Sequence, residues 1–368
     1  MKIAILGSRG FPSTYGGYET LVRHLAPWLA AQDHDVTVYC RTRGEGRREW
    51  MTEGVQCVAT AGLNATTLST VSHGATAALD AARRNYDAVL VLNIANGFFL
   101  PWLKMRGVPT AVNTDGLEWE RGKWGPAARS AFRLGAAMTA RHATELIADS
   151  KAIAEIWQTR FNVESTYVPY GAEVVRSVEG GDDLERLKIS PGRYLLVVAR
   201  LIPENNVELA LDAIDRLGDE APPAVVVGSA TFASPIETRL RRLQDQGKLK
   251  WLGHVNDQRL LGQLWSNAAV YFHGHSVGGT NPALLQALGA GAPVIALDTP
   301  FNREVIRDPV QLVPRDARKL AERIRSLIAS ESDRARLGSH GQQLVAEHYQ
   351  WNDVCAQYLE VLRRIAGH

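Results

Sequence analysis

The strongest constraint on the fold is a regular alternation of short apolar runs with longer segments of helical periodicity. In the first half of the chain, the apolar runs cover residues 2–6 (KIAIL), 35–40 (DVTVYC), 88–93 (AVLVLN), 109–114 (PTAVNT) and 145–149 (ELIAD). The alternation restarts with residues 193–199 (RYLLVVA) and continues to residues 293–297 (PVIAL). Short β-rich runs separated by helical segments are typical of parallel β-α-β layers. The chain is therefore predicted to be an α/β protein with parallel sheets.

The length points to two domains. A chain of 368 residues is longer than one hydrophobic core usually serves, so two domains of ~150 to 200 residues are expected. The Gly- and Asp-rich stretch 177–192 lies where the pattern restarts, and the seam is predicted there. Two doubly wound, Rossmann-like domains follow, residues 1–175 and 176–345. Residues 346–368 are helical in period, and they either pack locally or cross back and tie the two halves together.

Composition excludes several classes of protein. With 45% hydrophobic residues, 22% charged residues and a formal net charge of +2, the chain shows no general preference for nucleic acid. Cys40, Cys57 and Cys355 lack zinc-site spacing and are predicted to be reduced thiols in a cytoplasmic protein. No signal-peptide pattern opens the chain, and no apolar run reaches the ~18 to 20 residues of a membrane span. A soluble cytoplasmic protein is expected, with peripheral contact at the inner face of the cell membrane as an option.

The segment 273–291 (HGHSVGGTNPALLQALGAG) has the pattern of an anion site. Asn281 is a good N-cap and Pro282 suits the first helical position, so a helix is predicted to begin there. Gly278 and Gly279 let a ligand approach the backbone closely, where free N–H groups and the helix dipole favour a phosphate. An ordinary turn from loop to helix is the alternative.

Two other strand ends carry candidate ligand groups. The loop 7–19 (GSRGFPSTYGGYE) is rich in glycine but lacks G-x-G-x-x-G, which argues against a dinucleotide-binding oxidoreductase. It still lies outside the carboxyl end of a strand, where α/β sheets bind ligands. Arg200 directly follows the strand 193–199, and its guanidinium is placed to clamp a phosphate.

Four blocks, in order and spread over nearly the whole chain, resemble a known family. They begin at Gly7 (GSRGFPSTYGGYETLVRHLAP), Val112 (VNTDGLEWERGKW), Val198 (VARLIPENN) and His273 (HGHSVGGTNPALLQALGAG). The chain resembles the retaining, metal-independent GT-B-fold enzymes of glycosyltransferase family 4, in particular a rhamnosyltransferase-like subgroup. The resemblance implies two Rossmann-like domains that face a central crevice, and it favours residues 346–368 crossing back onto the N-terminal domain.

The resemblance gives roles to donor-binding residues. The family holds the donor diphosphate with an R-x4-K pattern, which falls here on Arg200 and Asn205. The Lys is therefore missing, which leaves Arg200, the helix start and His275 to compensate the phosphate charge. Two family glutamates, which contact the donor sugar and the ribose, fall on Gly278 and Gln286. Because Gln286 offers one acceptor oxygen, a nucleotide without a 2′-hydroxyl, such as dTDP, is favoured.

Further donor contacts are implied for the neighbours of Gly278, which has no side chain to bind a sugar hydroxyl. The segment 251–255 (WLGHV) also matches the family's base-binding strand end, and a buried structural strand is the competing interpretation. The donor-binding residues added in this way are Gly279, Thr280, Asn281, Gly253 and His254.

Acceptor chemistry falls in the first half. Gly16 and Gly17 match a family loop that lies near the donor phosphate and the acceptor. Asp115 follows the strand 109–114 and is predicted to orient the acceptor hydroxyl or to accept its proton, with a turn Asp before Gly116 as the alternative. The predicted acceptor-binding residues are Tyr15, Tyr18, Glu19, Asp115 and Glu118, and the predicted catalytic residues are Arg200, Asp115 and His275.

No metal or other cofactor is expected. The D-x-D match at Asp33-His34-Asp35 lies at the amino end of the strand 35–40, away from the carboxyl edge, and is predicted to be structural. The basic stretch 41–50, with Arg41, Arg43, Arg47 and Arg48, is either a solvated loop or a contact for anionic headgroups.

The sequence thus predicts a hexosyltransferase. It would transfer a sugar, rhamnose from dTDP-rhamnose as first choice, to a hydroxyl of a saccharide or lipid-linked saccharide acceptor, with retention and without a metal. A GT-B-fold nucleotide-sugar epimerase and a non-catalytic sugar-nucleotide-binding subunit are the alternatives.

Overall fold

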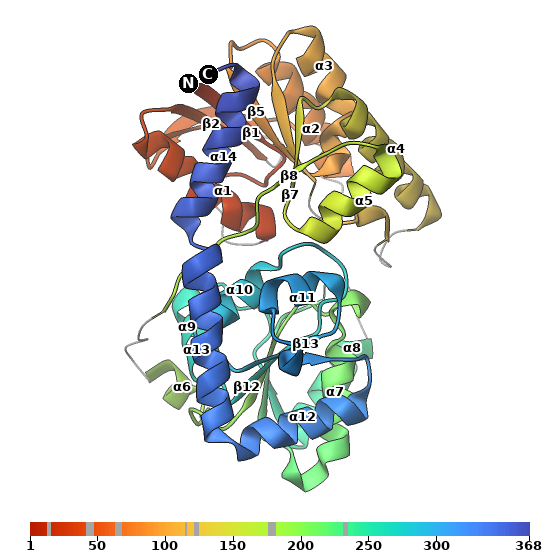
Figure 1. Cartoon of the computed structure of the whole chain (residues 1–368), viewed down its shortest axis with the longest axis vertical. Coiled ribbons are helices and arrows are strands. Elements are labelled where there is room, and N and C mark those ends of the chain that lie inside the picture. Colours follow the sequence, from red (N-terminus) through yellow and green to blue (C-terminus); the bar gives the residue numbers. More distant parts are fainter. Residues whose placement is uncertain are drawn as a thin grey trace. The chain divides into compact units, whose positions relative to one another are not determined.

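The computed structural model describes residues 1–12, 16–41, 48–62, 68–114, 116–120, 125–175, 182–230 and 235–368 (Figure 1). The chain divides into two compact units. Unit 1 comprises Met1–Tyr170 and Trp351–His368, and unit 2 comprises Gly171–Gln350. The domain boundaries predicted after residues 175 and 345 lie close to these divisions.

Unit 1 contains an eight-stranded sheet in the order β3-β4-β2-β1-β5-β6-β7-β8. Its strands are β1 (Lys2–Leu6), β2 (Asp35–Arg41), β3 (Arg48–Thr52), β4 (Val55–Thr60), β5 (Ala88–Leu92), β6 (Thr110–Asn113), β7 (Glu145–Ala148) and β8 (Thr166–Tyr167). Its helices are α1 (Gly17–Ala31), α2 (Leu68–Ala81), α3 (Leu100–Met105), α4 (Pro126–His142), α5 (Lys151–Phe161) and α14 (Trp351–Ala366), with 3-10 turns η1 (Ile94–Phe99) and η2 (Glu118–Glu120). Neighbouring strands run parallel except for the antiparallel pair β3 and β4.

Burial explains which strands the sequence predicted. Every residue of β5 is buried, as expected for a parallel strand with helices on both faces, and its apolar run was predicted. Strand β3 is an exposed edge strand of sequence REWMT, and it has neither an apolar run nor a regular alternation. The sequence analysis therefore missed β3. It also missed its partner β4, although β4 is largely buried.

Helix α14 belongs to unit 1, so the predicted return of the C-terminal helix is confirmed. It packs against α1, β5 and β6. The Asn113 amide donates to the Tyr358 hydroxyl at 2.5 Å, and His24 stacks on Trp351 with ring centroids 4.1 Å apart. An aromatic stack thus fixes the first residue of this helix, and a buried polar pair fixes its middle.

Unit 2 contains a six-stranded, fully parallel sheet in the order β11-β10-β9-β12-β13-β14. Its strands are β9 (Leu195–Val198), β10 (Ala224–Val227), β11 (Leu249–Trp251), β12 (Val270–His273), β13 (Val294–Leu297) and β14 (Leu312–Val313). Its helices are α6 (Asp182–Arg186), α7 (Val207–Leu217), α8 (Pro235–Asp245), α9 (Gln258–Ser266), α10 (Pro282–Gly289), α11 (Pro300–Ile306), α12 (Ala317–Ala329) and α13 (Glu331–His348), with 3-10 turns η3 (Pro203–Asn205), η4 (Gly218–Glu220) and η5 (Pro309–Gln311).

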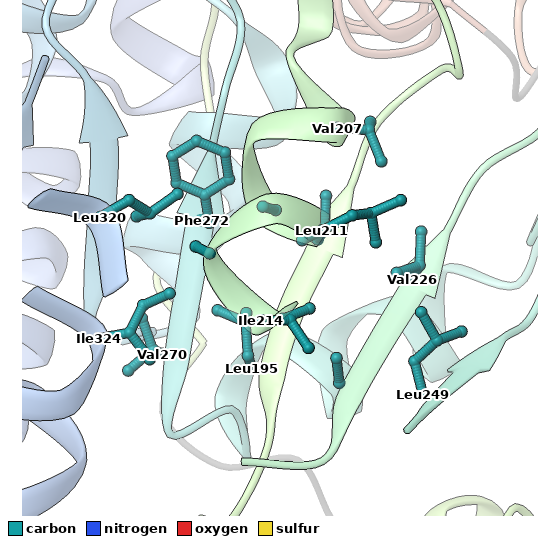
Figure 2. Packing of buried hydrophobic residues seen from close by; sticks show 14 of the residues in the cluster. Leu195, Val207, Leu211, Ile214, Val226, Leu249, Val270, Phe272, Leu320 and Ile324 are labelled. Atoms are coloured by element: carbon teal, nitrogen blue, oxygen red, sulfur yellow. The ribbon is translucent and has the colours of Figure 1, made fainter. Parts of the chain in front are cut away.

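The core of unit 2 lies between its sheet and the helices α7 and α12. Figure 2 shows Leu195 of β9 and Phe272 of β12 facing Leu211 and Ile214 of α7, with Ile324 of α12 beside them. All five side chains are at most 2% exposed. This packing holds the two central strands, β9 and β12, side by side.

Truncating one of these side chains should destabilise unit 2. We expect Leu211→Ala to lower the free energy of unfolding by about 2 to 5 kcal/mol, because the surrounding core cannot close the cavity completely. Leu209→Ala, on the same helix but only partly buried at the margin of the core, is the matched control and should cost clearly less. Denaturant titration measures both, and equal losses would contradict the packing described for α7.

Candidate functional site

The carboxyl edge of the unit 2 sheet gathers several of the predicted donor residues. Since its strands are parallel, all their carboxyl ends meet at one edge. Arg200 follows β9 and is exposed, and His275 follows the adjacent strand β12 and is half-buried. Gly253 and His254 follow β11, two strands from β9. The structure therefore brings these predicted residues to a common edge.

The strand ends around Arg200 are closely packed. The Gly228 N–H donates to the Gly253 carbonyl at 2.6 Å, and the Ala199 N–H donates to the Val227 carbonyl at 3.0 Å. Gly228 has a φ of +139°, and a Cβ added there would lie 1.8 Å from the Ala199 carbonyl oxygen. Only glycine fits this approach, which fixes the backbone from which the Arg200 side chain projects.

The turn after Arg200 is tied to the loop after β12. The Asn206 side-chain amide donates to the Gly274 carbonyl at 2.7 Å. The backbone N–H and the hydroxyl of Ser276 both donate to the Glu204 carbonyl, each at 2.9 Å. The segments that carry Arg200 and His275 are therefore linked to each other by hydrogen bonds.

Asn205 has a structural role beside Arg200 that the sequence did not indicate. Its side chain is 3% exposed, and its amide donates to the Arg200 carbonyl at 2.9 Å. Asn205, which stands at the position of the family's lysine, thus holds the Arg200 backbone through a buried hydrogen bond. A direct donor contact for Asn205 stays a prediction.

Helix α10 begins as the sequence predicted. The Asn281 side-chain oxygen accepts from the Ala283 N–H at 3.0 Å, and Pro282 is the first helical residue. Gly278 has a φ of +132°, a conformation that side-chain-bearing residues rarely adopt, and the space around its Cβ position is open for 4 Å. The glycine at this position is therefore explained by the backbone, and it leaves room for a ligand at the helix start.

The other predicted donor-binding residues differ in solvent exposure. Thr280 is 3% exposed, whereas Gly279 and Gln286 are half-buried. Gln286 lies one turn into α10. His254, at the end of β11, is exposed, and its Nε2 lies 2.7 Å from the Asn256 side-chain oxygen.

A buried histidine that the sequence analysis did not assign lies under the site. His273, the last residue of β12, is fully buried, and its ring stacks on that of His275 with centroids 4.3 Å apart. Its Nδ1 lies 3.1 Å from the Tyr271 hydroxyl. Burial lowers the pKa of His273 to about 3, so the ring is neutral at physiological pH. The alternation of histidines at 273 and 275 was the available signal, but only the fold shows that one is buried beneath the other.

Asn302 of α11 is a second supporting residue that the sequence did not indicate. Its side chain is 3% exposed, and its amide donates to the His275 carbonyl at 3.1 Å and to the Leu297 carbonyl at 2.8 Å. The His275 backbone is therefore held by α11 as well as by the turn after Arg200.

Part of the predicted acceptor set is placed in unit 1. Gly16 and Gly17 lie at the start of α1. Glu19 is 7% exposed, and its carboxylate accepts from the Arg9 N–H at 3.0 Å, so it ties the glycine loop together. Tyr18 points its hydroxyl to the Asn113 carbonyl at a long 3.5 Å, and Glu118 is 7% exposed in η2.

Several predicted residues lie outside the described residues, namely Tyr15, Asp115, Arg43 and Arg47.

The Asp33-His34-Asp35 turn lies at the amino end of β2, as predicted. In the described part of the chain, no three His, Cys, Asp or Glu side chains gather where they could hold a metal ion. No helix in that part is both long and apolar enough to span a bilayer.

The neutral, buried His273 should make stability depend on pH. The unfolded chain takes up a proton at this histidine as the pH falls below about 6.5, whereas the folded chain does not, down to a pH of about 3. Stability should therefore fall on acidification, by about 1.4 kcal/mol per pH unit within this window.

We expect His273→Gln to remove this contribution. Between pH 7 and pH 5, the wild-type protein should lose about 2 kcal/mol more unfolding free energy than the variant. Urea titration at both pH values measures the difference. His348→Gln, at an exposed site on α13, is the control and should follow the wild type. An unchanged pH dependence in His273→Gln would show that His273 is not buried neutral.

Comparison with known proteins matches both halves of the chain to domain families. Residues 183–344 match the family model of glycosyl transferases group 1, and residues 1–173 match a domain of unknown function, DUF1972. A UDP-N-acetylglucosamine–peptide N-acetylglucosaminyltransferase GtfA subunit of Streptococcus agalactiae is 24% identical over 127 residues. That alignment covers 33% of this chain and 24% of that relative.

Solved structures match the whole chain. Sucrose-phosphate synthase from Thermosynechococcus elongatus superposes with a TM-score of 0.81 at 17% identity, over 99% of this chain and 98% of that chain. HepE of Anabaena, solved in complex with UDP, superposes with a TM-score of 0.77 at 17% identity, over 99% and 100% of the two chains. At this level of identity the likeness establishes the fold, which is GT-B. The group 1 match of residues 183–344 agrees with this fold.

Proposed function

We propose that this protein is a glycosyltransferase that transfers a sugar from a nucleoside-diphosphate sugar to a hydroxyl of a saccharide acceptor. The observation that carries the proposal is that Arg200 and the start of helix α10 both lie at the carboxyl edge of the unit 2 sheet. The two come from the adjacent strands β9 and β12 of unit 2, the unit that matches the group 1 model. A guanidinium beside a helix N-terminus is suited to a diphosphate.

The backbone around these groups supports the assignment. Asn281 caps α10, Gly278 leaves open space before it, and Gly228 and Asn205 fix the segment that carries Arg200. Groups that are held before the ligand arrives need no reorganisation when charge develops. The site is therefore preorganised for an anion that becomes more negative during the reaction.

The reaction that fits is cleavage of the bond between the sugar carbon and the β-phosphate oxygen. As this bond breaks, negative charge accumulates on the departing diphosphate. Arg200 and the N–H groups at the start of α10 would stabilise that charge, which is usually the largest single contribution to catalysis of this kind. His275, held by Asn302 and stacked on the neutral His273, would donate a further hydrogen bond.

Retention and the acceptor side are proposed on the family resemblance. The departing phosphate would take the proton of the acceptor hydroxyl on the same face of the sugar, so no side-chain nucleophile is required. Asp115 would orient that hydroxyl, and the glycine loop at Gly16 and Gly17 would line the acceptor end in unit 1. The acceptor is proposed to be a saccharide, free or lipid-linked, and no metal is proposed to take part.

The donor proposed first is dTDP-rhamnose. Gln286 stands where the family has a carboxylate for the ribose, and it has only one acceptor oxygen to offer. Its half-buried position one turn into α10 is compatible with a contact to the sugar of the nucleotide. UDP- and GDP-sugars are the next candidates, and the UDP complex of the structural relative HepE favours UDP among them.

Replacing Arg200 should slow transfer without unfolding the protein. We expect Arg200→Ala to lower turnover by about 10² to 10³, the usual cost of one lost charge-stabilising donor. Arg200 is exposed, so the change leaves the core intact. The measurement is the transfer of labelled sugar from dTDP-rhamnose to extracted lipid-linked saccharide. Arg216→Ala, an exposed site on α7, is the matched control. Near-normal turnover in Arg200→Ala would remove this residue from the diphosphate site.

Nucleotides should stabilise the protein selectively. In the presence of EDTA, we expect dTDP to raise the melting temperature more than UDP, GDP or ADP. A ligand at ~100 times its dissociation constant adds about 2.7 kcal/mol of stability, enough for a shift of a few degrees. A larger shift with UDP would reject the rhamnose donor while keeping the transferase. No shift with any nucleoside diphosphate would reject the donor site.

A further inference from the structure

A hollow lies mainly at the opposite edge of the unit 2 sheet. It has a volume of about 550 Å³ and is lined by the segment that precedes β9, the start of β10, and the edge strand β11 with the residues on either side of it. In a parallel sheet the amino and carboxyl ends of the strands lie at opposite edges. Neither Arg200 nor any residue of α10 lines the hollow, which is therefore separate from that candidate site.

The lining is rich in positive charge. It includes Arg186, Lys188 and Arg193 from the segment before β9, and Lys248 and Lys250 from β11 and the turn before it. Among the described residues, no Asp or Glu contributes to the lining. Five cationic side chains around one cavity repel one another, and an anionic ligand relieves that repulsion.

Two of these cations are already engaged. The Arg186 guanidinium pairs with Asp183, and the Lys250 ammonium donates to the Leu187 carbonyl. Lys188, Arg193 and Lys248 are exposed, and within the described ranges no carboxylate forms an ion pair with them. These three side chains are therefore available to a ligand.

The frame that carries them is fixed by hydrogen bonds. The Lys188 N–H donates to the Glu185 carbonyl and the Ile189 N–H to the Leu184 carbonyl, both at 2.8 Å. On the facing side, the Lys248 N–H donates to the Leu243 carbonyl at 3.0 Å. The carbonyls of Leu184, Glu185 and Leu243 thus accept from backbone N–H groups, and Lys188 and Lys248 need not neutralise them.

The cavity also has apolar walls. Ile189 and Leu249 are 6% and 4% exposed, and Pro223 and Leu252 also belong to the lining. The Trp251 N–H, at the free edge of β11, donates to the Gln244 side-chain oxygen at 2.8 Å, so this edge is not open for another strand. Cations around an apolar floor suit a ligand with phosphate groups on an organic body.

We propose that this hollow, which we call the amino-edge pocket, is a second binding site for phosphate esters. Its lining is Arg186–Ser190, Arg193–Tyr194, Pro223–Val225, Gln244 and Gly247–Leu252. Lys188, Arg193 and Lys248 bind the phosphate, and the apolar floor packs against the group that carries it. The ester is either a free phosphorylated metabolite or a phospholipid headgroup. The site is independent of the donor site and does not rest on the proposed transfer reaction.

The test compares two triple variants of the full chain. K188Q/R193Q/K248Q removes the proposed phosphate ligands, and R216Q/R242Q/K319Q removes three exposed cations of α7, α8 and α12, outside the pocket. Both variants lose the same net charge. Arg200→Ala is added to every protein to weaken phosphate binding at the carboxyl edge, and any binding that remains there is the same in the parent and in both triple variants.

The soluble arm of the test titrates glucose 6-phosphate and inorganic pyrophosphate by calorimetry. The membrane arm measures sedimentation with phosphatidylcholine vesicles that contain phosphatidylglycerol, against vesicles of phosphatidylcholine alone. In at least one arm, we expect the parent protein to bind, K188Q/R193Q/K248Q to bind at least about tenfold more weakly, and the control triple variant to stay within about twofold of the parent.

The arm that responds identifies the source of the phosphate ester. A response to the soluble phosphates supports a free metabolite, and a response to anionic vesicles alone supports a headgroup. Equal weakening in both triple variants would show that only net charge matters. That result would overturn the proposal. An unchanged affinity in K188Q/R193Q/K248Q would overturn it too, as would the absence of binding by the parent protein in both arms.

Discussion

The candidate site depends on one constraint, the parallel pairing of β9 between β10 and β12. This pairing places Arg200 and His275 at the ends of adjacent strands, although 75 residues separate them along the chain. The contact between Gly228 and the Ala199 carbonyl and the bond from Asn206 to Gly274 extend the pairing beyond the sheet. The loops that carry the functional side chains are therefore continuations of a rigid element, and their positions follow from the packing of the core beneath them.

The sequence predicted the elements whose local signals agree with their environment. Strand β5 is apolar and buried throughout, and the start of α10 has both its cap and its proline. The sequence could not predict β3, because an exposed edge strand shows no apolar pattern. It also could not show that Asn205 faces the Arg200 carbonyl or that His273 lies beneath His275, since burial and side-chain direction at these positions are set by segments distant in the sequence.

Departures from the family pattern are informative when the backbone is considered. Gly278 stands where the resemblance expects a glutamate, and its φ of +132° shows that the loop has a conformation that favours glycine. Asn205 stands where a lysine is expected, and its buried side chain donates to the Arg200 carbonyl. In the proposed donor site, these two changes would leave recognition of the diphosphate to the backbone, to Arg200 and to the helix start.

The two edges of the unit 2 sheet differ in how they can hold an anion. At the carboxyl edge, the helix start, the glycines and one guanidinium form a site in which backbone dipoles are oriented by the fold and cannot move away. At the amino edge, Lys188, Arg193 and Lys248 are exposed side chains on flexible stems, whose attraction for an anion is screened by salt within about 10 Å at ordinary ionic strength. Oriented dipoles suit a transition state whose charge develops at one atom, whereas mobile charges suit reversible binding of phosphates of different shape. In the two proposals made above, the same sheet would support catalysis at one edge and reversible binding at the other.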